Sequence, residues 1–280
     1  MRFTLGADPE LFIVNNRNQS LACAHGVIPG TKEDPYPVTD GAIQVDGIAL
    51  EFNIHPAESE DEFVYNIDSV LRELRQAVPS GFQFSRSEGV CPKQSTWDSF
   101  PMEAKNIGCD PEYDAYTGTI RPLDRSNIKN IRARGAGGHI HIGWRSDNID
   151  PLDPIHIKDC QMVAKELDIV LGVPSVLVTS HKKAQHRRAT NNGLAGAFRP
   201  KPYGMEYRTL SNFWIFNDKY RREIYRTVEA TLAHVDNAGR TLYQDRIDSY
   251  YVIEALESHS ESYARSVLNY LPKDAYHAAF

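Results

Sequence analysis

Cysteine is scarce in this 280-residue chain: the four cysteines are at positions 23, 91, 109 and 160, and no two form a Cys-x-x-Cys pair. Their spacing argues against a disulfide framework and a thiolate zinc site, and it fits a reducing compartment. No apolar run approaches the roughly 20 residues that cross a bilayer, and the N-terminal MRFTLGADPELF lacks the apolar core of a signal peptide. We therefore expect a soluble cytoplasmic protein with no membrane partner.

A basic excess is also missing, because 31 Lys and Arg stand against 37 Asp and Glu, for a formal net charge of -6. A broad nucleic-acid footprint needs a basic surface, so we expect no nucleic-acid partner. The phosphate-binding loop GxxxxGK[ST] is absent, which disfavours that mode of nucleotide binding. The composition, 41% hydrophobic and 24% charged, is that of an ordinary globular protein.

Hydrophobic residues at helical spacing predict helices over residues 59–77, 154–171, 218–235 and 246–268. Asp153 and Asn217 are suited to cap the second and third of these helices, and the GVP that begins at residue 172 is expected to end the second. Residues 80–130 are rich in Pro, Gly, Asp and Asn, so we expect irregular structure there. Strands separated by these helices indicate an α+β fold built on an antiparallel sheet.

Four predicted strands carry polar residues at alternate positions. Side chains alternate between the two faces of a strand, so each polar pair shares one face and the apolar residues share the other. An isolated His-x-His most often lies on a solvated strand face. Exposed strand faces usually carry Thr, Lys, Gln and Ser, however, and the four polar pairs contain none of these residues. The pairs are Asp8 and Glu10, Glu51 and Asn53, His139 and His141, and Glu206 and Arg208.

Carboxylates gathered on one sheet face would repel each other unless cations lay among them. Oxygen ligands with little sulfur select Mg²⁺ or Mn²⁺ over zinc, and one or two histidines are compatible with either ion. We therefore predict a metal cluster. Its predicted ligands are Asp8, Glu10, Glu51, His139 and Glu206.

Basic residues form a second group, mainly in a predicted polar loop that runs from residue 180 towards the strand YGMEYRTL. Guanidinium forks suit phosphate oxygens, and nearby glycines let backbone amides approach a ligand. Divalent cations beside arginines imply a polyphosphate substrate, most simply ATP. The predicted anion-binding residues are Arg188, Arg199 and Arg208, with Arg134 added from RARGAG.

In chain order, Asp-x-Glu, Glu-x-Asn, Gly-x-Gly-Gly-His-x-His and Glu-x-Arg resemble the glutamine synthetase and glutamate–cysteine ligase superfamily. Within it, GADPELF, QVDGIALEFNI, AGGHIHIG and AGAFRPKPYGMEYRTLSNFW most resemble the phage-type carboxylate–amine ligases, or amidoligases. The resemblance implies a curved antiparallel sheet of glutamine synthetase-like catalytic type with flanking helices. It implies a ligase core over residues 1–215 and leaves a helical C-terminal region, 216–280, packed on it. If a phage encodes the chain, its compartment is the host cytoplasm.

The resemblance also implies ATP and two or three Mg²⁺ ions among the predicted metal ligands, although the family frequently has Glu where this chain has Asp8. Glu51, Arg199 and Arg208 would be catalytic. A substrate carboxylate would attack the γ-phosphate of ATP, and an amine would displace phosphate from the acyl phosphate to form an amide. The nucleotide would also contact His141, Asn53, Arg134 and Arg188, and the proton of the amine would pass to one of Asp46, Asp110 and Glu112.

Two other classes of function remain open. One is a metal-dependent amidohydrolase that uses the His-x-His strand, although that motif usually opens a (β/α)₈ barrel and here comes halfway along the chain. The other is a catalytically inactive relative that binds a nucleotide or another ligand. The substrates are also open: the carboxylate and the amine could each belong to an amino acid, a peptide or a protein, and the chain could form a homo-oligomer.

Overall fold

The first two strands form one bent strand that belongs to two sheets. In the computed structural model, which describes residues 2–106, 111–122, 131–144, 148–238 and 243–272, β1 (Thr4–Ala7) and β2 (Glu10–Asn15) are separated only by Asp8 and Pro9. β1 pairs with β12 (Ile140–Gly143), whereas β2 pairs with β6 (Ala49–Ile54). Proline has no N–H for a ladder, so the strand changes partners there. The single strand predicted for this stretch is therefore two strands.

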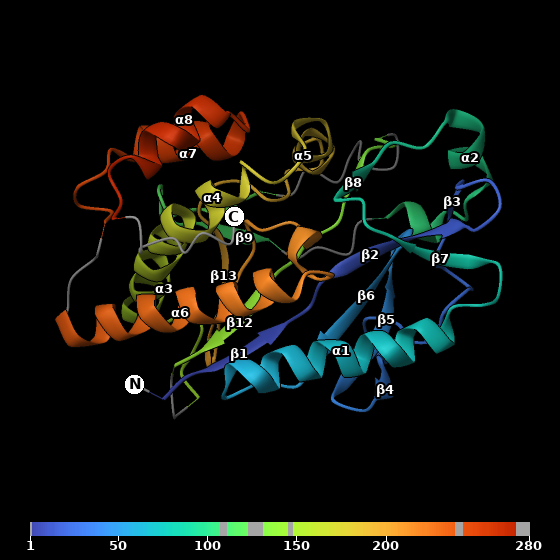
Figure 1. Cartoon of the computed structure of the whole chain (residues 1–280), viewed down its shortest axis with the longest axis horizontal. Coiled ribbons are helices and arrows are strands. Elements are labelled where there is room, and N and C mark those ends of the chain that lie inside the picture. Colours follow the sequence, from blue (N-terminus) through green and yellow to red (C-terminus); the bar gives the residue numbers. More distant parts are fainter. Residues whose placement is uncertain (1, 107–110, 123–130, 145–147, 239–242, 273–280) are drawn as a thin grey trace.

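Both sheets are antiparallel and curled, and the bent strand joins them (Figure 1). Residues of both sheets line a common cavity. The first has the order β1-β12-β14-β13-β9-β10, with β14 (Gly204–Tyr207), β13 (Ala197–Lys201), β9 (Glu112–Asp114) and β10 (Ile120–Arg121). The second has the order β3-β2-β6-β5-β4, with β3 (Leu21–Ala22), β5 (Gly41–Asp46), β4 (Tyr36–Val38) and, also on β2, β7 (Phe82–Ser85). A small ladder joins β8 (Gly89–Val90) to β11 (Arg134–Gly135). The prediction of a curved antiparallel sheet with helices is confirmed.

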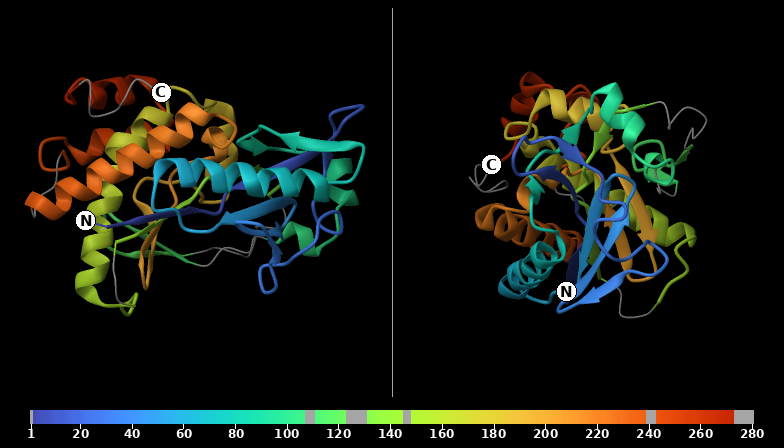
Figure 2. Two further views of the ribbon diagram at one scale, coloured as in Figure 1. Left: turned by 60° about the horizontal axis from the view of Figure 1, so that its bottom comes forward. Right: turned by 90° about the vertical axis from the view of Figure 1, so that its right-hand side faces the viewer.

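Two long helices run side by side along the sheets (Figure 2). α1 (Glu60–Ala77) begins after Ser59, whose hydroxyl accepts from the Glu62 N–H, and it buries an apolar stripe against β5 and β6. α6 (Asp218–Ala238) begins after Asn217, whose Oδ1 accepts from the Tyr220 N–H. Both helices were predicted, and the Asn217 cap of α6 was predicted with it. The guanidinium groups of two α6 arginines reach Glu60 of α1 and tie the helices together.

The helix predicted to end before Gly172 continues instead. α3 (Pro154–Leu167), capped by Asp153 as predicted, passes into a π-helical turn over Asp168–Gly172 and then α4 (Val173–Ser175). Pro174 lies in the first turn of α4, where its fixed φ is compatible with helical backbone. The turn places the Asp168 carboxylate where it accepts from the hydroxyls of Tyr207 and Thr209.

Three other expectations require correction. The basic loop contains α5 (His181–Arg188), which shows no apolar period because its buried residues are Ala184 and Arg187. The helix predicted over 246–268 is two helices, since His259 has a left-handed φ of 51° between them. Residues 80–130 hold several short elements rather than irregular chain alone. The two helices of the C-terminal segment are α7 (Ser249–Glu257) and α8 (Glu261–Leu268). The short elements of residues 80–130 are α2 (Gln94–Ser99) and the 3₁₀ turn Glu103–Lys105, besides β7 to β10.

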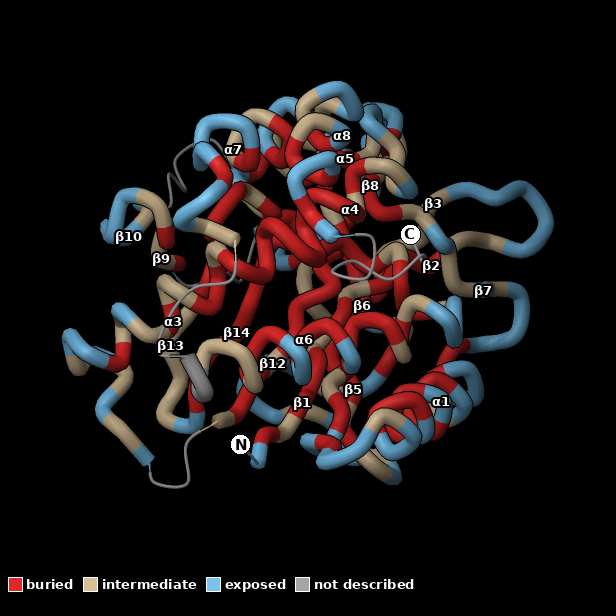
Figure 3. Tube along the Cα trace, turned by 60° about the vertical axis from the view of Figure 1, so that its left-hand side comes forward, coloured by how far each residue is buried: buried red, intermediate tan, exposed pale blue. Residues whose placement is uncertain are grey.

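The buried residues lie along the strands and on the inner sides of the helices (Figure 3). One apolar cluster includes residues of both sheets, of α1 and α6, and of the C-terminal α7 and α8. A 3₁₀ turn over Asn212–Trp214 contributes the fully buried Trp214. Cys23, Cys91 and Cys160 are free thiols, and Cys109 lies outside the described residues. Within the described part of the chain, no helix combines the length and apolarity needed to cross a bilayer.

Candidate active site

Each sheet contributes a row of polar residues at its centre. In the first sheet, strand pairing sets Glu206 of β14 between His141 of β12 and Arg199 of β13. In the second, the row is made of Glu10, Glu51 and Gln44. Members of both rows line a cavity of about 150 Å³ that lies where the bent strand joins the sheets. The alternation read from the sequence therefore predicts the correct faces of β6, β12 and β14.

Two groups of side chains at this cavity, which we call the acidic groups, could each hold a metal ion. Each consists of three residues whose potential ligand atoms all lie within 4.8 Å of one another. Four of the five predicted metal ligands belong to these groups, while His139 lies beside them, its Nδ1 3.5 Å from Asp8 Oδ1 and 3.8 Å from Glu206 Oε1. The groups are Asp8, His141 and Glu206, and Glu10, Asp46 and Glu51.

The two groups differ in their electrostatic environment. Glu206 is almost fully buried and is paired with three cations: Arg208, Lys201 at 3.1 Å and Arg199 at 3.4 Å. Burial raises the pKa of Glu206, but Arg208 and the other neighbouring cations outweigh burial and hold its pKa well below the usual range. The Glu206 carboxylate is thus ionised and largely neutralised by the protein itself.

Glu51 is in the opposite situation. Its Oε1 accepts from the Gln44 amide at 2.7 Å, but the charges that weigh most on it are other carboxylates. Burial and then Asp8, Asp46 and the remaining acidic neighbours raise the pKa of Glu51 well above its ordinary value. Burial and Asp46 likewise raise the pKa of Glu10 to about 7, although the Gly137 N–H donates to it. This group is therefore deficient in positive charge.

The donor chemistry of the Glu10 group fits a hard divalent cation. Three carboxylates supply the oxygen ligands that Mg²⁺ and Mn²⁺ prefer, and their mutual repulsion in a buried setting is what such an ion would relieve. Asp46 was considered from sequence only as an acceptor of the amine proton. Its place opposite Ala49 in the β5–β6 hairpin brings it to Glu10 and Glu51.

A larger cavity, of about 430 Å³, adjoins the acidic groups. Asp8, Glu51 and His141, which line it, also belong to the acidic groups, and Ala7, Ile54 and Pro56 are among its apolar lining residues. Asn53, a predicted nucleotide contact, also lines it. A small cavity of about 30 Å³ lies on the other side of Glu10 and Asp46.

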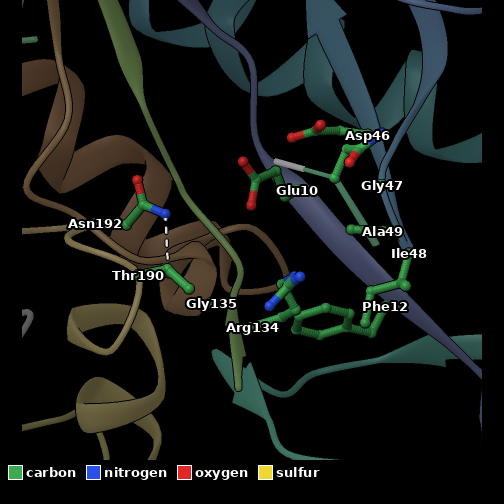
Figure 4. A pocket seen from close by; sticks show the side chains of 11 residues that line it. Glu10, Phe12, Asp46, Gly47, Ile48, Ala49, Arg134, Gly135, Thr190 and Asn192 are labelled. Atoms are coloured by element: carbon green, nitrogen blue, oxygen red, sulfur yellow. Dashed lines mark hydrogen bonds between the residues drawn. The ribbon is translucent and has the colours of Figure 1, made fainter. Parts of the chain in front are cut away.

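Figure 4 shows the small cavity, with the carboxylates of Glu10 and Asp46 on one side. Arg134 lies across from them, held by its bonds to the carbonyls of Lys105, Ile131 and Ala133. Burial lowers the pKa of the Arg134 guanidinium to about 10, against the influence of Asp46. Asn192 and Thr190, hydrogen-bonded to each other at 3.1 Å, form a third wall.

The predicted anion-binding arginines lie in different places. Arg199 and Arg208 line the 150 Å³ cavity, the latter also bonded through Nε to Glu112 at 2.9 Å. Arg188 instead donates to the Leu256 carbonyl of α7, because α5 directs it toward the C-terminal helices. The structure therefore does not bring Arg188 to the acidic groups.

Sequence reasoning named Arg199 and considered Asp46, but it did not assign Gln44, Lys201 or Lys32, which also line the 150 Å³ cavity, to the site. Gln44 and Asp46 alternate along β5, and Arg199 and Lys201 alternate along β13, so both strands carry the same pattern as the four that were recognised. Lys32 of the Gly- and Pro-rich segment also lines the cavity and had no signal of its own. Of the other proposed proton acceptors, Glu112 is held in salt bridges, and Asp110 lies outside the described residues.

The raised pKa values of Glu10, Asp46 and Glu51 determine how the stability of the protein should depend on pH. Because the pKa of Glu10 is raised from 4.5 to about 7, the folded protein binds this proton more readily than the unfolded chain between those values. The free energy of unfolding of the metal-free protein should therefore rise as the pH falls from about 7 to 4.5, with Asp46 and Glu51 acting in the same direction. Urea unfolding in EDTA at a series of pH values measures this free energy.

Saturating Mg²⁺ is the control, because an ion that holds these carboxylates ionised should flatten the dependence. Asp8 and Glu206 have lowered pKa values, so their opposite contribution is lost only at lower pH. A metal-free protein that became more stable between pH 5 and pH 7 would contradict the assigned electrostatics.

Comparison with known proteins gives one family. A family model described as "Phage phiEco32-like COOH.NH2 ligase-type 2" matches residues 130–275, which is more than half of the chain. No curated protein matches the chain in sequence. Among solved structures, a bifunctional glutathione synthetase from Pasteurella multocida is similar over 96% of this chain, with 12% identity and a TM-score of 0.42, and this chain spans 46% of that protein. A similarity this distant supports no conclusion about fold or activity.

Proposed function

The chain belongs to the phage phiEco32-like COOH.NH2 ligase type 2 family, and from this premise we propose that it is an ATP-dependent carboxylate–amine ligase with an acyl-phosphate intermediate. The observation that carries the proposal is the order of the three cavities. A chamber large enough for a nucleoside leads to carboxylates and guanidinium groups, and a small acidic cavity lies beyond them. We propose that this curled sheet is of the glutamine synthetase-like catalytic type.

The residues of the 150 Å³ cavity are suited to hold a nucleotide triphosphate and divalent cations. Glu10, Asp46 and Glu51 would bind one Mg²⁺ ion, and Asp8, His141 and Glu206 would bind a second. Bound there, Mg²⁺ would neutralise phosphate and carboxylate oxygens, which lowers the barrier to their approach. Arg199, Lys201 and Arg208 would add positive charge beside the transferred phosphoryl group.

The reaction brings together two anions before it brings in the amine. A substrate carboxylate oxygen would attack the γ-phosphorus and release ADP, and the amine nitrogen would then displace phosphate and lose a proton. The small cavity at Glu10 and Asp46 favours a cationic ammonium group, so we assign it to the amine-bearing substrate. Glu112 is held by Arg121 and Arg208, and Asp46 would be a metal ligand, so the released phosphate would take the proton.

The hydrolase alternative finds no support in the architecture. The His-x-His strand β12 lies between antiparallel neighbours, β1 and β14, whereas in a (β/α)₈ barrel it would lie between parallel strands. The nucleotide-binding relative without catalysis keeps the same cavities and differs only in turnover. Both are separated from the ligase by one assay.

The assay uses hydroxylamine as the amine and a panel of amino acids, dicarboxylic acids and peptides as carboxylates. Hydroxylamine displaces phosphate from an acyl phosphate and leaves a hydroxamate, so the expected result is hydroxamate and phosphate in equal amounts. Both products should require ATP, Mg²⁺ and one class of carboxylate, and Glu51→Gln is the matched inactive control. Cleavage of an amide without nucleotide would support the hydrolase, and binding of ATP without any turnover would support the inactive relative.

A further inference from the structure

Tyr203 lies on the wall of the 430 Å³ chamber, in the turn between β13 and β14. The volume is within the roughly 300–1,000 Å³ of small-molecule sites. Asp8, Glu51 and His141 line the chamber and also belong to the acidic groups, so a nucleotide bound with its phosphates beside them would place its base against the other lining residues. Among the described residues that line the chamber, Tyr203 is the one with a large aromatic ring; none is Phe or Trp.

Glycines line the part of the chamber that lies next to Tyr203 and His141. Gly6 of β1 and Gly143 of β12 both line it, on adjacent strands. A Cβ at Gly143 would lie 2.5 Å from Thr4 Oγ1 and 3.7 Å from Tyr203 Cδ2. A side chain at this position would therefore clash with Thr4 and would be in ordinary contact with the tyrosine ring. The two strands present backbone to the chamber beside Tyr203.

Contacts at both ends hold Tyr203 in position. Its hydroxyl lies 2.5 Å from His141 Nδ1, and its carbonyl accepts from the Trp144 N–H at 3.0 Å. His141 Nε2 in turn lies 3.1 Å from Asp8 Oδ2. The side chain as a whole is nevertheless 36% exposed, so an anchored ring retains accessible surface. An anchored aromatic ring loses little conformational entropy when a planar ligand packs on it.

We propose that Tyr203 is a specificity-determining residue that stacks on the nucleobase of the bound nucleotide. The inference rests on the proposed function, since it concerns the same nucleotide. Every base has a π-face, and the larger face of a purine gives more contact, so ATP and GTP should bind more tightly than CTP and UTP. Through its hydroxyl, Tyr203 also connects the base end of the chamber to His141 and Asp8 at the phosphate end.

Calorimetry with two probes separates stacking from a structural role. Mg·ATP carries a base, whereas Mg·tripolyphosphate carries only the phosphates. Tyr203→Ala should weaken Mg·ATP about 5- to 150-fold, the range for loss of base–aromatic stacking, and should leave Mg·tripolyphosphate within about twofold. Tyr203→Phe keeps the ring and should retain most of the ATP affinity. Tyr65→Ala, at an exposed position on α1, is the matched control and should change neither affinity.

Each outcome decides the inference. Equal weakening of both probes by Tyr203→Ala would show a structural effect and overturn it, as would an unchanged affinity for ATP. A loss of ATP affinity in Tyr203→Phe as large as in Tyr203→Ala would assign the effect to the hydroxyl and also overturn it. If the wild type binds ATP in neither Mg²⁺ nor EDTA, the proposed function fails and this inference fails with it.

Discussion

Glu206→Gln should lower the free energy of unfolding by about 3–5 kcal/mol, the cost of breaking a buried ion pair. The substitution keeps the shape of the side chain and removes its charge. Arg208 would then keep Glu112 as a carboxylate partner. Lys201, whose Nζ lies 3.1 Å from Glu206 Oε2, would lose this ion pair. The loss arises because buried cations remain after their shared anion is gone.

Glu51→Gln should have the opposite effect on the metal-free protein and raise the free energy of unfolding by about 0.5–2 kcal/mol. The Glu51 charge is opposed by burial and by its acidic neighbours, so its removal relieves repulsion. Mg²⁺ should reverse the sign, because only the wild type gains the full binding energy of the ion.

Both variants should lose turnover in the hydroxamate assay, so stability and activity must be measured separately. Urea unfolding in EDTA and in Mg²⁺ gives the stability of each variant, and circular dichroism verifies the fold. Sequence alone treats Glu51 and Glu206 as equivalent metal ligands, since both alternate with apolar residues on a strand. The same sign of change in stability for both variants in EDTA would contradict the electrostatic difference between the two groups.

Arg199→Lys should reduce kcat and kcat/KM together, by on the order of 10²–10⁵, the range for arginines that stabilise a phosphoryl group in transfer. Arg199 is the more accessible of the two arginines at the cavity, with 16% of its side chain exposed against 4% for Arg208. Its Nη1 lies 3.4 Å from Glu206 Oε1, beside the place proposed for the phosphates. Lysine should substitute poorly because it lacks the planar fork.

Steady-state kinetics with the carboxylate found in the hydroxylamine panel checks this prediction. The dissociation constant of Mg·ATP should change little, since the cations and the rest of the nucleotide still bind. Arg226→Lys, on the α6 surface where it pairs with Glu60, is the matched control and should leave the kinetics unchanged. An increase in the KM for ATP alone, with kcat intact, would make Arg199 a binding residue and not a catalytic one.

The faces of the central strands were predictable because a period of two is a local property. Leu50, Phe52 and Ile54 enter the core, which leaves Glu51 and Asn53 on the other face whatever strand lies next to them. The same logic applies to β5 and β13, but Pro200 within β13 argued against a strand there, so Arg199 and Lys201 were assigned to a loop.

The choice of neighbours was not predictable, because alternation assigns a side chain to a face without saying which strand it meets. Nothing local indicates that Glu10 lies opposite Glu51 while His141 lies opposite Glu206.

The helix α5 was not predicted, for a different reason. Its buried Arg187 bonds to the carbonyls of residues 208–210 and gives no apolar signal.

The bent strand that joins the two sheets also determines the order in which the chain acquires its site during folding. β2 can pair with β6 once about fifty residues are present, but the partner of β1 begins only at Ile140. Contacts of such large sequence separation form late, because the loop between them must close first. A nascent chain that ends before Arg199 therefore holds Glu10, Asp46 and Glu51 but lacks Arg199 and Lys201 of β13 and Arg208, which follows β14. The full set of residues proposed to bind the nucleotide is present only once residue 208 has been made.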